Sequence, residues 1–305
     1  VVGCVATAMS QIMKYWEHPA QGTGEHSYKP ADDKYGYPEQ YANFGEAKYD
    51  WANMPYQLDK NSPQEQIDAV ALLGYHCGVS VDMMYDDDGT GSGAFSVDVP
   101  KAMNNYFGYA KSNFRPRTVS SQVWDSYIRE ALEMRRPIFY AGTSEKGGGH
   151  AFVCDGFDEN GLFHYNYGWS GSGDGYFASS AIDYPNDVGA IFDIMPEEVH
   201  KNTLEAPKRL EVVPADNAGL KATITWKNPS YTLDGTSITT IDKIVVERNG
   251  KVIYEEEAVK AGETMKFVDE NVPCYSAFDY SVYAIMNGSR GKIAKEESVP
   301  FGPTC

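Results

Sequence analysis

The stretch GGGHAFVCDG at residues 147–156 marks the point where the chain changes from helical to strand patterns. Three consecutive glycines favour a loop, and the apolar run at residues 150–154 has the length and composition of a buried strand. A similar run precedes it at residues 137–141, and another follows at residues 162–167. Because the Asn-Gly pair at residues 160–161 is a hairpin signal, we expect neighbouring strands to run antiparallel.

The part of the chain before residue 137 shows helical spacing instead. Apolar residues recur every three to four positions, which predicts helices at about residues 5–16, 62–78, 97–106 and 121–134. Beyond the strands named above, two more short strands are expected at residues 175–177 and 190–194. Helices first and antiparallel strands afterwards predict an α+β domain.

A second, all-β domain is predicted after a linker at residues 195–207, where proline and charged residues interrupt the apolar pattern. Only short strand patterns follow, at residues 210–213, 220–226, 244–247, 252–256, 265–268 and 280–285. Short strands at regular spacing are typical of a β-sandwich. We therefore expect two domains, over residues 1–197 and residues 206–305.

The net charge and the hydropathy of the chain argue against binding to nucleic acid and against insertion into a membrane. The 305 residues carry a formal net charge of −17, which repels nucleic acid and anionic lipid. No run of 18 apolar residues is present, so no membrane-spanning helix is expected. The chain opens directly on an apolar helix pattern, which predicts a processed or partial product that has lost an upstream segment.

Cys4 is the first candidate catalytic residue. It stands at the start of the first predicted helix, directly after Gly3, which allows a sharp backbone turn. The free N–H groups at a helix N-terminus carry partial positive charge and favour the thiolate, the nucleophilic form of cysteine. The alternative role is that of a small apolar residue that packs at a helix start.

His150 and Asn166 can complete a site with Cys4. The glycines before His150 leave clearance for a substrate backbone, and a histidine held there can act as a general base. The Asn166 amide can orient the imidazole, and Trp169 can shield that hydrogen bond from water. Each residue alone is also compatible with a structural role. Together, cysteine, histidine and asparagine follow the chain order of papain-like thiol peptidases.

Three segments resemble the streptopain family of papain-like cysteine peptidases. They are GCVATA followed by QIMKY at residues 3–8 and 11–15, GGHAFV followed by DG at residues 148–153 and 155–156, and NYGW at residues 166–169. The segment GVSVDM at residues 78–83 and the pair Ser92-Gly93 are similar to further parts of the family. The resemblance covers about residues 1–195.

The resemblance implies a secreted or surface-located bacterial endopeptidase that acts on proteins or peptides and is made as a zymogen with a propeptide. It implies that Cys4 attacks the substrate carbonyl, that His150 transfers the proton, and that Asn166 orients His150 beneath Trp169. It also implies a preference for a hydrophobic side chain two residues before the cleaved bond. The implied substrate-binding residues are Ser92, Gly93, Gly149 and Tyr167. No cofactor and no metal are expected.

Two departures from the family pattern bear on activity. Tyr167 stands where the family has a further tryptophan, which alters the shape of the site. The family's oxyanion-hole glutamine lies well upstream of the nucleophile, and no glutamine within this chain has matching surroundings. We therefore expect an upstream segment of the complete protein to supply it, because losing one oxyanion donor costs about 10²–10³ in rate.

Three further features carry weaker signals. The second domain is similar to a fibronectin type III module, with Trp226 followed by Pro229, and no binding partner for it follows from the sequence. Residues 86–92 resemble a calcium loop in composition but lack its terminal glutamate, which favours an ordinary loop. His164 lies two residues before Asn166, and a structural role is expected for it.

Two other functions stay open. A papain-like amidase of cell-wall peptides would use the same three residue types. A non-catalytic surface adhesin could instead be built on a peptidase scaffold, with the second domain as its binding part. The match of whole segments favours the peptidase over the amidase, and the presence of Cys4, His150 and Asn166 together argues against the adhesin.

Cys274 and Cys305 offer a disulfide that the sequence leaves undecided. If the strand after Cys274 pairs antiparallel with the last strand, both thiols lie at one end of the sandwich; the alternative is two free thiols. Closing a loop of about 30 residues stabilises a fold by about 3–4 kcal/mol in the chain-entropy model. Mass spectrometry of the unreduced protein decides between them: a linked peptide pair shows the bridge, and two alkylated cysteines exclude it.

Overall fold

The computed structural model describes residues 2–30, 36–86, 91–215, 220–273 and 276–301. Cys274 and Cys305 lie outside these ranges, so their disulfide stays a prediction. Residues 87–90 of the candidate calcium loop also lie outside them. No helix in the described part of the chain is both long and apolar enough to cross a membrane.

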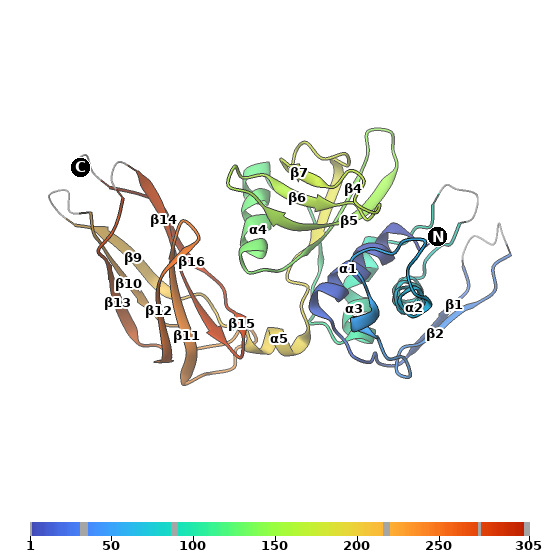
Figure 1. The fold of residues 1–305 in the computed structure, drawn as a ribbon, viewed down its shortest axis with the longest axis horizontal. Coiled ribbons are helices and arrows are strands. Elements are labelled where there is room, and N and C mark those ends of the chain that lie inside the picture. Colours follow the sequence, from blue (N-terminus) through green and yellow to red (C-terminus); the bar gives the residue numbers. More distant parts are fainter. Residues whose placement is uncertain (1, 31–35, 87–90, 216–219, 274–275, 302–305) are drawn as a thin grey trace. The chain divides into compact units, whose positions relative to one another are not determined.

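The first compact unit, residues 1–197, begins with its helices. Figure 1 shows α1 (Cys4–Trp16), α2 (Gln64–Ser80), α3 (Val99–Phe107) and α4 (Ser121–Glu133). Their ends follow local chemistry: the Ser120 hydroxyl accepts a hydrogen bond from the backbone N–H of Val123 and caps α4. Gly108 ends α3 in the left-handed region that glycine adopts without strain.

A six-stranded antiparallel sheet follows, with the strand order β3-β8-β4-β5-β6-β7. The strands are β3 (Phe114–Pro116), β4 (Ile138–Thr143), β5 (Gly149–Phe157), β6 (Phe163–Asn166), β7 (Gly175–Phe177) and β8 (Asn186–Ile191). The predicted α+β class is confirmed. A separate hairpin of β1 (Glu25–Tyr28) and β2 (Gln40–Asn43) lies in the segment between α1 and α2.

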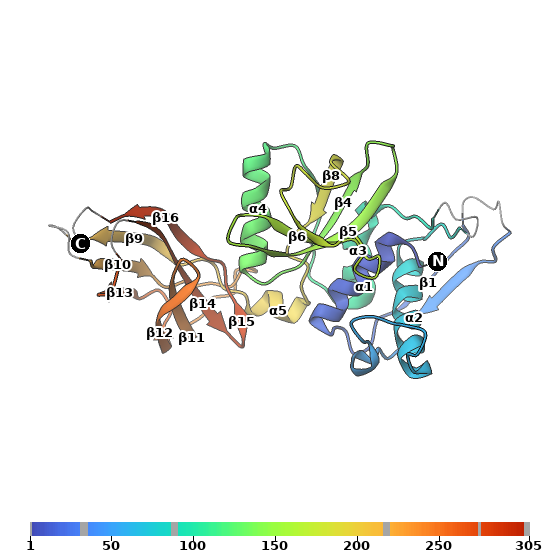
Figure 2. The same ribbon diagram turned by 45° about the horizontal axis from the view of Figure 1, so that its top comes forward.

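The sheet buries both faces, and the alternation along β4 and β5 divides their side chains between two cores. The core shared with α1, α2 and α3 receives Phe139, Ala151 and Val153. The core shared with α4 receives Ile138, Tyr140, Phe152 and Cys154. Figure 2 shows α1 and α4 on opposite sides of these strands. Because both faces are covered, the central strands read as continuous apolar runs.

The predicted linker is not wholly irregular. Within residues 195–207 lies the short helix α5 (Glu197–Asn202), whose last turn carries His200 and Lys201. Basic side chains suit the negative end of the helix dipole, so the charge run that suggested a linker also stabilises a helix.

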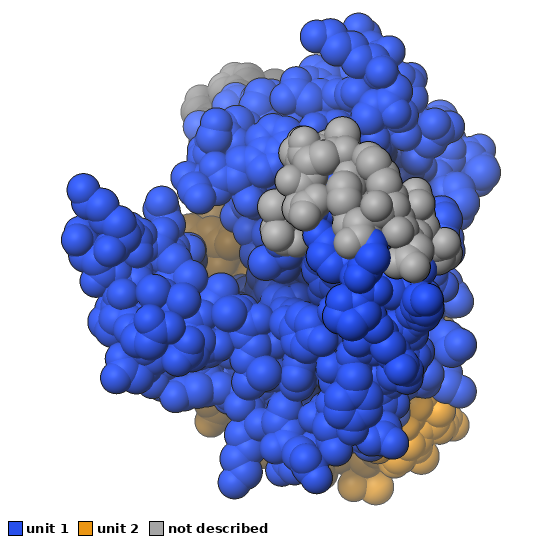
Figure 3. All heavy atoms as spheres, turned by 90° about the vertical axis from the view of Figure 1, so that its right-hand side faces the viewer, with its two compact units in different colours: residues 1–197 blue, residues 198–305 orange. Residues whose placement is uncertain are grey.

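The second compact unit, residues 198–305, is all-β beyond α5; Figure 3 colours it orange and the first unit blue. One sheet has the order β13-β10-β9, and the other has the order β12-β11-β14-β15, with β16 also paired to β14. These strands are β9 (Lys208–Pro214), β10 (Ala222–Lys227), β11 (Thr240–Arg248), β12 (Lys251–Lys260), β13 (Thr264–Asp269), β14 (Ala277–Met286), β15 (Ser289–Arg290) and β16 (Ala294–Pro300). One core takes side chains from both sheets, as in a sandwich. The likeness to a fibronectin type III module stays a prediction.

The core of the second unit depends on Trp226. Its side chain is buried among strands of both sheets, and its indole N–H donates a 2.8 Å hydrogen bond to the Asn228 side chain. We expect Trp226→Ala to lower the free energy of unfolding of this unit by about 3–5 kcal/mol, because it leaves a large cavity. Urea denaturation measures the change. Replacement of the exposed Tyr231 by Ala is the control, and an equal effect of both variants would contradict this account.

Candidate active site

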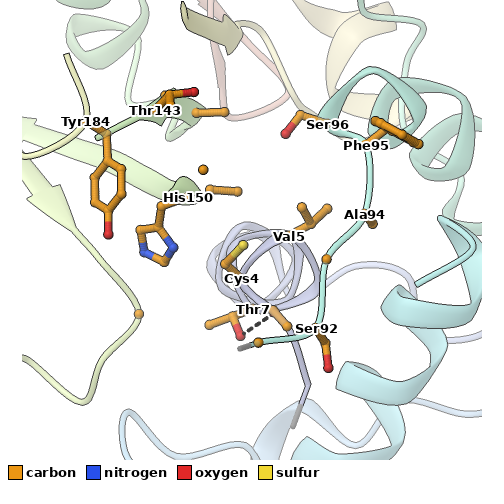
Figure 4. A pocket seen from close by; sticks show the side chains of 18 of the residues that line it. Cys4, Val5, Thr7, Ser92, Ala94, Phe95, Ser96, Thr143, His150 and Tyr184 are labelled. Atoms are coloured by element: carbon orange, nitrogen blue, oxygen red, sulfur yellow. Dashed lines mark hydrogen bonds between the residues drawn. The ribbon is translucent and has the colours of Figure 1, made fainter. Parts of the chain in front are cut away.

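A cleft of about 800 Å³ in the first unit contains the predicted nucleophile and base (Figure 4). Its walls come from the start of α1, from the segment at residues 91–97, from β4 and β5, and from the loops at residues 167–169 and 184–187. Its volume is in the range of small-molecule and peptide-binding sites. Cys4 and His150 both line it.

Cys4 is the first residue of α1, and Gly3 makes that position possible. Gly3 has a φ of 89°, and a Cβ there would lie 2.7 Å from Met83 Sδ and 3.1 Å from the Ser92 carbonyl oxygen. Only glycine therefore fits between Cys4 and its neighbours. At the first turn the backbone N–H of Cys4 has no acceptor within the helix, so it can stabilise negative charge in the cleft.

The two other described cysteines are unsuited to catalysis. Cys77 and Cys154 are buried in the cores, whereas Cys4 is partly exposed. Burial raises the pKa of the Cys77 thiol to about 12 and holds the pKa of Cys154 well above its usual range. Neither thiol is accessible to a substrate, and neither lines the cleft.

His150 is the second residue of β5 and pairs with Gly142 of β4. Its Nε2 lies 2.8 Å from the backbone carbonyl oxygen of Tyr167. A carbonyl oxygen can only accept, so Nε2 carries the proton of the neutral ring and Nδ1 is left as the basic nitrogen. Burial lowers the pKa of His150, and the bond to Tyr167 offsets part of that effect. No hydrogen bond joins Cys4 to His150 in the described part of the chain.

Aromatic rings surround the imidazole. Trp169 stacks on it with ring centroids 4.7 Å apart and planes inclined by 29°. The Tyr184 ring lies beside the imidazole as well, with its centroid 5.0 Å from that of His150, a contact that local sequence patterns did not predict. Gly142 allows this approach, because a Cβ there would lie 2.2 Å from the Tyr184 carbonyl oxygen. No local pattern around Tyr184 signals the contact, which depends on the fold of the loop before β8.

The predicted role of Asn166 needs a correction. Its Oδ1 accepts hydrogen bonds of 2.9 Å from the backbone N–H of Gly168 and from the Gln11 side chain. No bond joins its amide to His150 among the described residues; the Tyr167 carbonyl, one residue further on, occupies Nε2 instead. The short turn after β6 directs a backbone oxygen toward the ring and turns the amide toward α1. Asn166 therefore stabilises the turn that holds the base.

The four predicted substrate-binding residues all line the cleft but differ in what they can offer. A Cβ on Gly93 would meet no atom within 4 Å, and one on Gly149 would meet only the Gly142 carbonyl oxygen, at 4.0 Å. Ser92 is buried, and its hydroxyl accepts a bond from the backbone N–H of Asp86, so it shapes the loop. Tyr167 is buried as well, and its contribution is the carbonyl at His150.

One wall of the cleft is apolar. Met84, Phe95 and Val97 line it and are 39%, 68% and 61% exposed, respectively. Among the described lining residues, Asp187 is the single charged side chain, and no glutamine is present. The described residues contain no cluster of histidine, cysteine and carboxylate side chains that could hold a metal ion.

His164 has structural partners, as expected of it. Its Nδ1 lies 2.5 Å from Asp155 Oδ1 on the neighbouring strand, and its ring packs against Tyr176. It does not line the cleft.

Comparison with known proteins places this site in a family. A model of the peptidase C10 family matches residues 1–177. The chain belongs to the peptidase C10 family. This match includes Cys4, His150 and Asn166, and it confirms the resemblance inferred from the three sequence segments.

Several relatives are similar over the first unit. The thiol protease/hemagglutinin PrtT of Porphyromonas gingivalis is 37% identical over 190 residues, which are 61% of this chain and 21% of PrtT. Streptopain of Streptococcus pyogenes is 34% identical over 192 residues, 61% of this chain and 47% of streptopain. The chain thus spans about a fifth and about half of these two relatives. The active interpain A cysteine protease of Prevotella intermedia superposes with a TM-score of 0.57 at 32% identity, covering 62% of this chain and 82% of interpain A.

The buried surroundings of His150 predict the direction in which its pKa is shifted. Because burial lowers its pKa, the imidazole is expected to titrate below the ordinary value of 6.5. Trp169→Ala admits water to the ring, so it should move the pKa back up toward 6.5. NMR titration of the ring protons, assigned with a His150→Gln variant, measures both. A value at or above 6.5 in the unchanged protein would contradict the desolvated site.

Proposed function

We propose that the first unit is a cysteine endopeptidase that hydrolyses proteins or peptides. The observation that carries this proposal is the cleft in which a partly exposed Cys4, at the N-terminus of α1, shares the walls with a histidine held through Nε2. Membership of the peptidase C10 family supports the same reaction. The nucleophile is Cys4, the proton carrier is His150, and Asn166 and Trp169 hold and cover that histidine.

The reaction follows from the two side chains. Nδ1 of His150 takes the thiol proton as Cys4 Sγ attacks the carbonyl carbon of the substrate. Negative charge develops on the carbonyl oxygen, where the backbone N–H of Cys4 can donate. The protonated imidazole then gives its proton to the departing amine, which leaves a thioester on Cys4. His150 next removes a proton from water as the water attacks the thioester. The C–S bond then breaks, the carboxylic acid product leaves, and the imidazolium returns its proton to the Cys4 thiolate.

The cleft walls suggest which substrates bind. Since Met84, Phe95 and Val97 present apolar surface beside Cys4, we propose that a hydrophobic side chain two residues before the cleaved bond binds there. A hydrophobic contact of this kind contributes free energy by removing apolar area from water. The open space at Gly93 and Gly149 leaves room for the backbone of an extended substrate.

The remaining proposals concern the whole protein. We propose that it is a secreted or surface-located bacterial enzyme, matured from a zymogen by loss of a propeptide. One solved relative, a fragment of prointerpain A of Prevotella intermedia, is 34% identical with a TM-score of 0.56, and its name records a precursor form. A second oxyanion donor is expected from an upstream glutamine. The second unit is proposed to be a fibronectin type III-like module.

Two substrates separate the peptidase from the amidase. Under reducing conditions the proposed enzyme should digest casein and leave muropeptides intact. Cleavage of muropeptides alone would favour the amidase, and a thiol at Cys4 that reacts with neither substrate would favour the adhesin.

Cys4→Ala tests the nucleophile. We expect at least a 10³-fold loss of casein hydrolysis with an unchanged circular dichroism spectrum, because no other accessible thiol lines the cleft. Cys154→Ala is the matched control, since this thiol points from β5 into the core shared with α4, and the activity of the variant should stay close to that of the unchanged protein. Retained activity in Cys4→Ala, or loss only in Cys154→Ala, would identify a different nucleophile.

A further inference from the structure

The helix that carries Cys4 also contacts the turn that holds His150. The Gln11 side chain, in the third turn of α1, donates from Nε2 to Asn166 Oδ1 at 2.9 Å. The same oxygen accepts the backbone N–H of Gly168 at 2.9 Å. Between these two turn residues lies Tyr167, whose carbonyl oxygen binds His150 at 2.8 Å. A continuous path of hydrogen bonds and one short turn therefore joins α1 to the imidazole.

The spacing along α1 makes this path a property of one helix face. Cys4, Thr7 and Gln11 are three and four positions apart, so they lie on the same side of the helix. Thr7 lies close to the turn as well, because a Cβ on Gly168 would lie only 2.9 Å from Thr7 Cγ2. The face that presents the nucleophile thus also supports the carbonyl that orients the base.

The orientation of the Gln11 amide follows from its partner. Asn166 Oδ1 must accept, since the backbone N–H of Gly168 can only donate to it. Gln11 must then present its NH₂ group to that oxygen. Its other atom, Oε1, is buried and has no partner among the described residues. The amide therefore leaves one polar atom unpaired while it keeps the bond to Asn166.

We propose that Gln11 is a positioning residue: it sets the turn at residues 166–168 relative to α1, and through Tyr167 it holds His150 in the orientation and tautomer that face Cys4. This inference rests on the proposed peptidase function. Gln11 does not line the cleft, so it acts on the rate of the chemical step and leaves substrate binding unchanged. Displacement of a reacting group by about 1 Å can cost about 10² in rate, which sets the scale of the effect.

Gln11→Leu is the first test. We expect kcat for a peptide substrate to fall by about tenfold to 10²-fold with KM unchanged. Thermal unfolding by circular dichroism reports whether the variant folds. Gln64→Ala is the matched control, because Gln64 also donates to a side chain of a neighbouring turn, Asp68, but lies on the exposed start of α2. A kcat equal to that of the unchanged protein in a folded Gln11→Leu variant would overturn the proposal.

Gln11→Glu keeps the shape and supplies a second test that a purely structural role would not satisfy. The ionised carboxylate faces Asn166 Oδ1 as acceptor against acceptor and repels it, whereas the protonated form can donate. The ratio of variant to unchanged kcat should therefore rise as the pH falls from about 7 to about 5, toward the usual glutamate pKa. A ratio independent of pH would overturn the proposal even if Gln11→Leu fails to fold.

The same assays separate this inference from the proposed function. If the unchanged protein hydrolyses no peptide, or Cys4→Ala is as active as the unchanged protein, the peptidase assignment fails and the role of Gln11 fails with it. If Cys4→Ala is inactive but the Gln11 variants have an unchanged kcat and a flat pH ratio, only the positioning role is wrong.

Discussion

The 2.8 Å hydrogen bond between His150 Nε2 and the carbonyl oxygen of Tyr167 is the constraint on which the rest of the site depends. A backbone carbonyl offers no donor, so this single contact determines which ring nitrogen is protonated and which is basic. It also moves the task of orienting the base from a side chain to the shape of a turn. A change in the backbone of that turn therefore alters the orientation of the imidazole.

Two layers of the fold converge on this turn. From one side, α1 brings Cys4 into the cleft and binds the turn through Gln11 and Asn166. From the other, β5 carries His150, and its alternating side chains anchor it in a core on each face of the sheet. Close packing on both faces leaves little freedom for relative movement of helix and strand. Cys4 and His150 are thus held by rigid elements, an arrangement that suits the proposed reaction.

Burial decides which thiol can react. Three described cysteines are chemically equivalent in the unfolded chain, yet Cys77 and Cys154 are enclosed in apolar cores that disfavour their thiolates. Burial also lowers the pKa of His150, which keeps the imidazole neutral and able to accept a proton. Desolvation therefore disfavours the thiolates of Cys77 and Cys154, and it favours the neutral, basic form of His150.

Local sequence patterns predicted the α+β order of the first unit and the strands of the second, and they selected Cys4 and His150, which both line the cleft. Those features depend on local periodicity and on glycines beside both residues, which neighbours along the chain already encode. The partner of His150 was assigned to the Asn166 amide, because a sequence names side chains and does not show where a backbone oxygen points. Tyr184 and Gln11 were missed, since their contacts join segments far apart in the chain. The Tyr167 carbonyl reaches His150 because the turn closes against α1, and that closure depends on contacts between distant segments that local patterns do not encode.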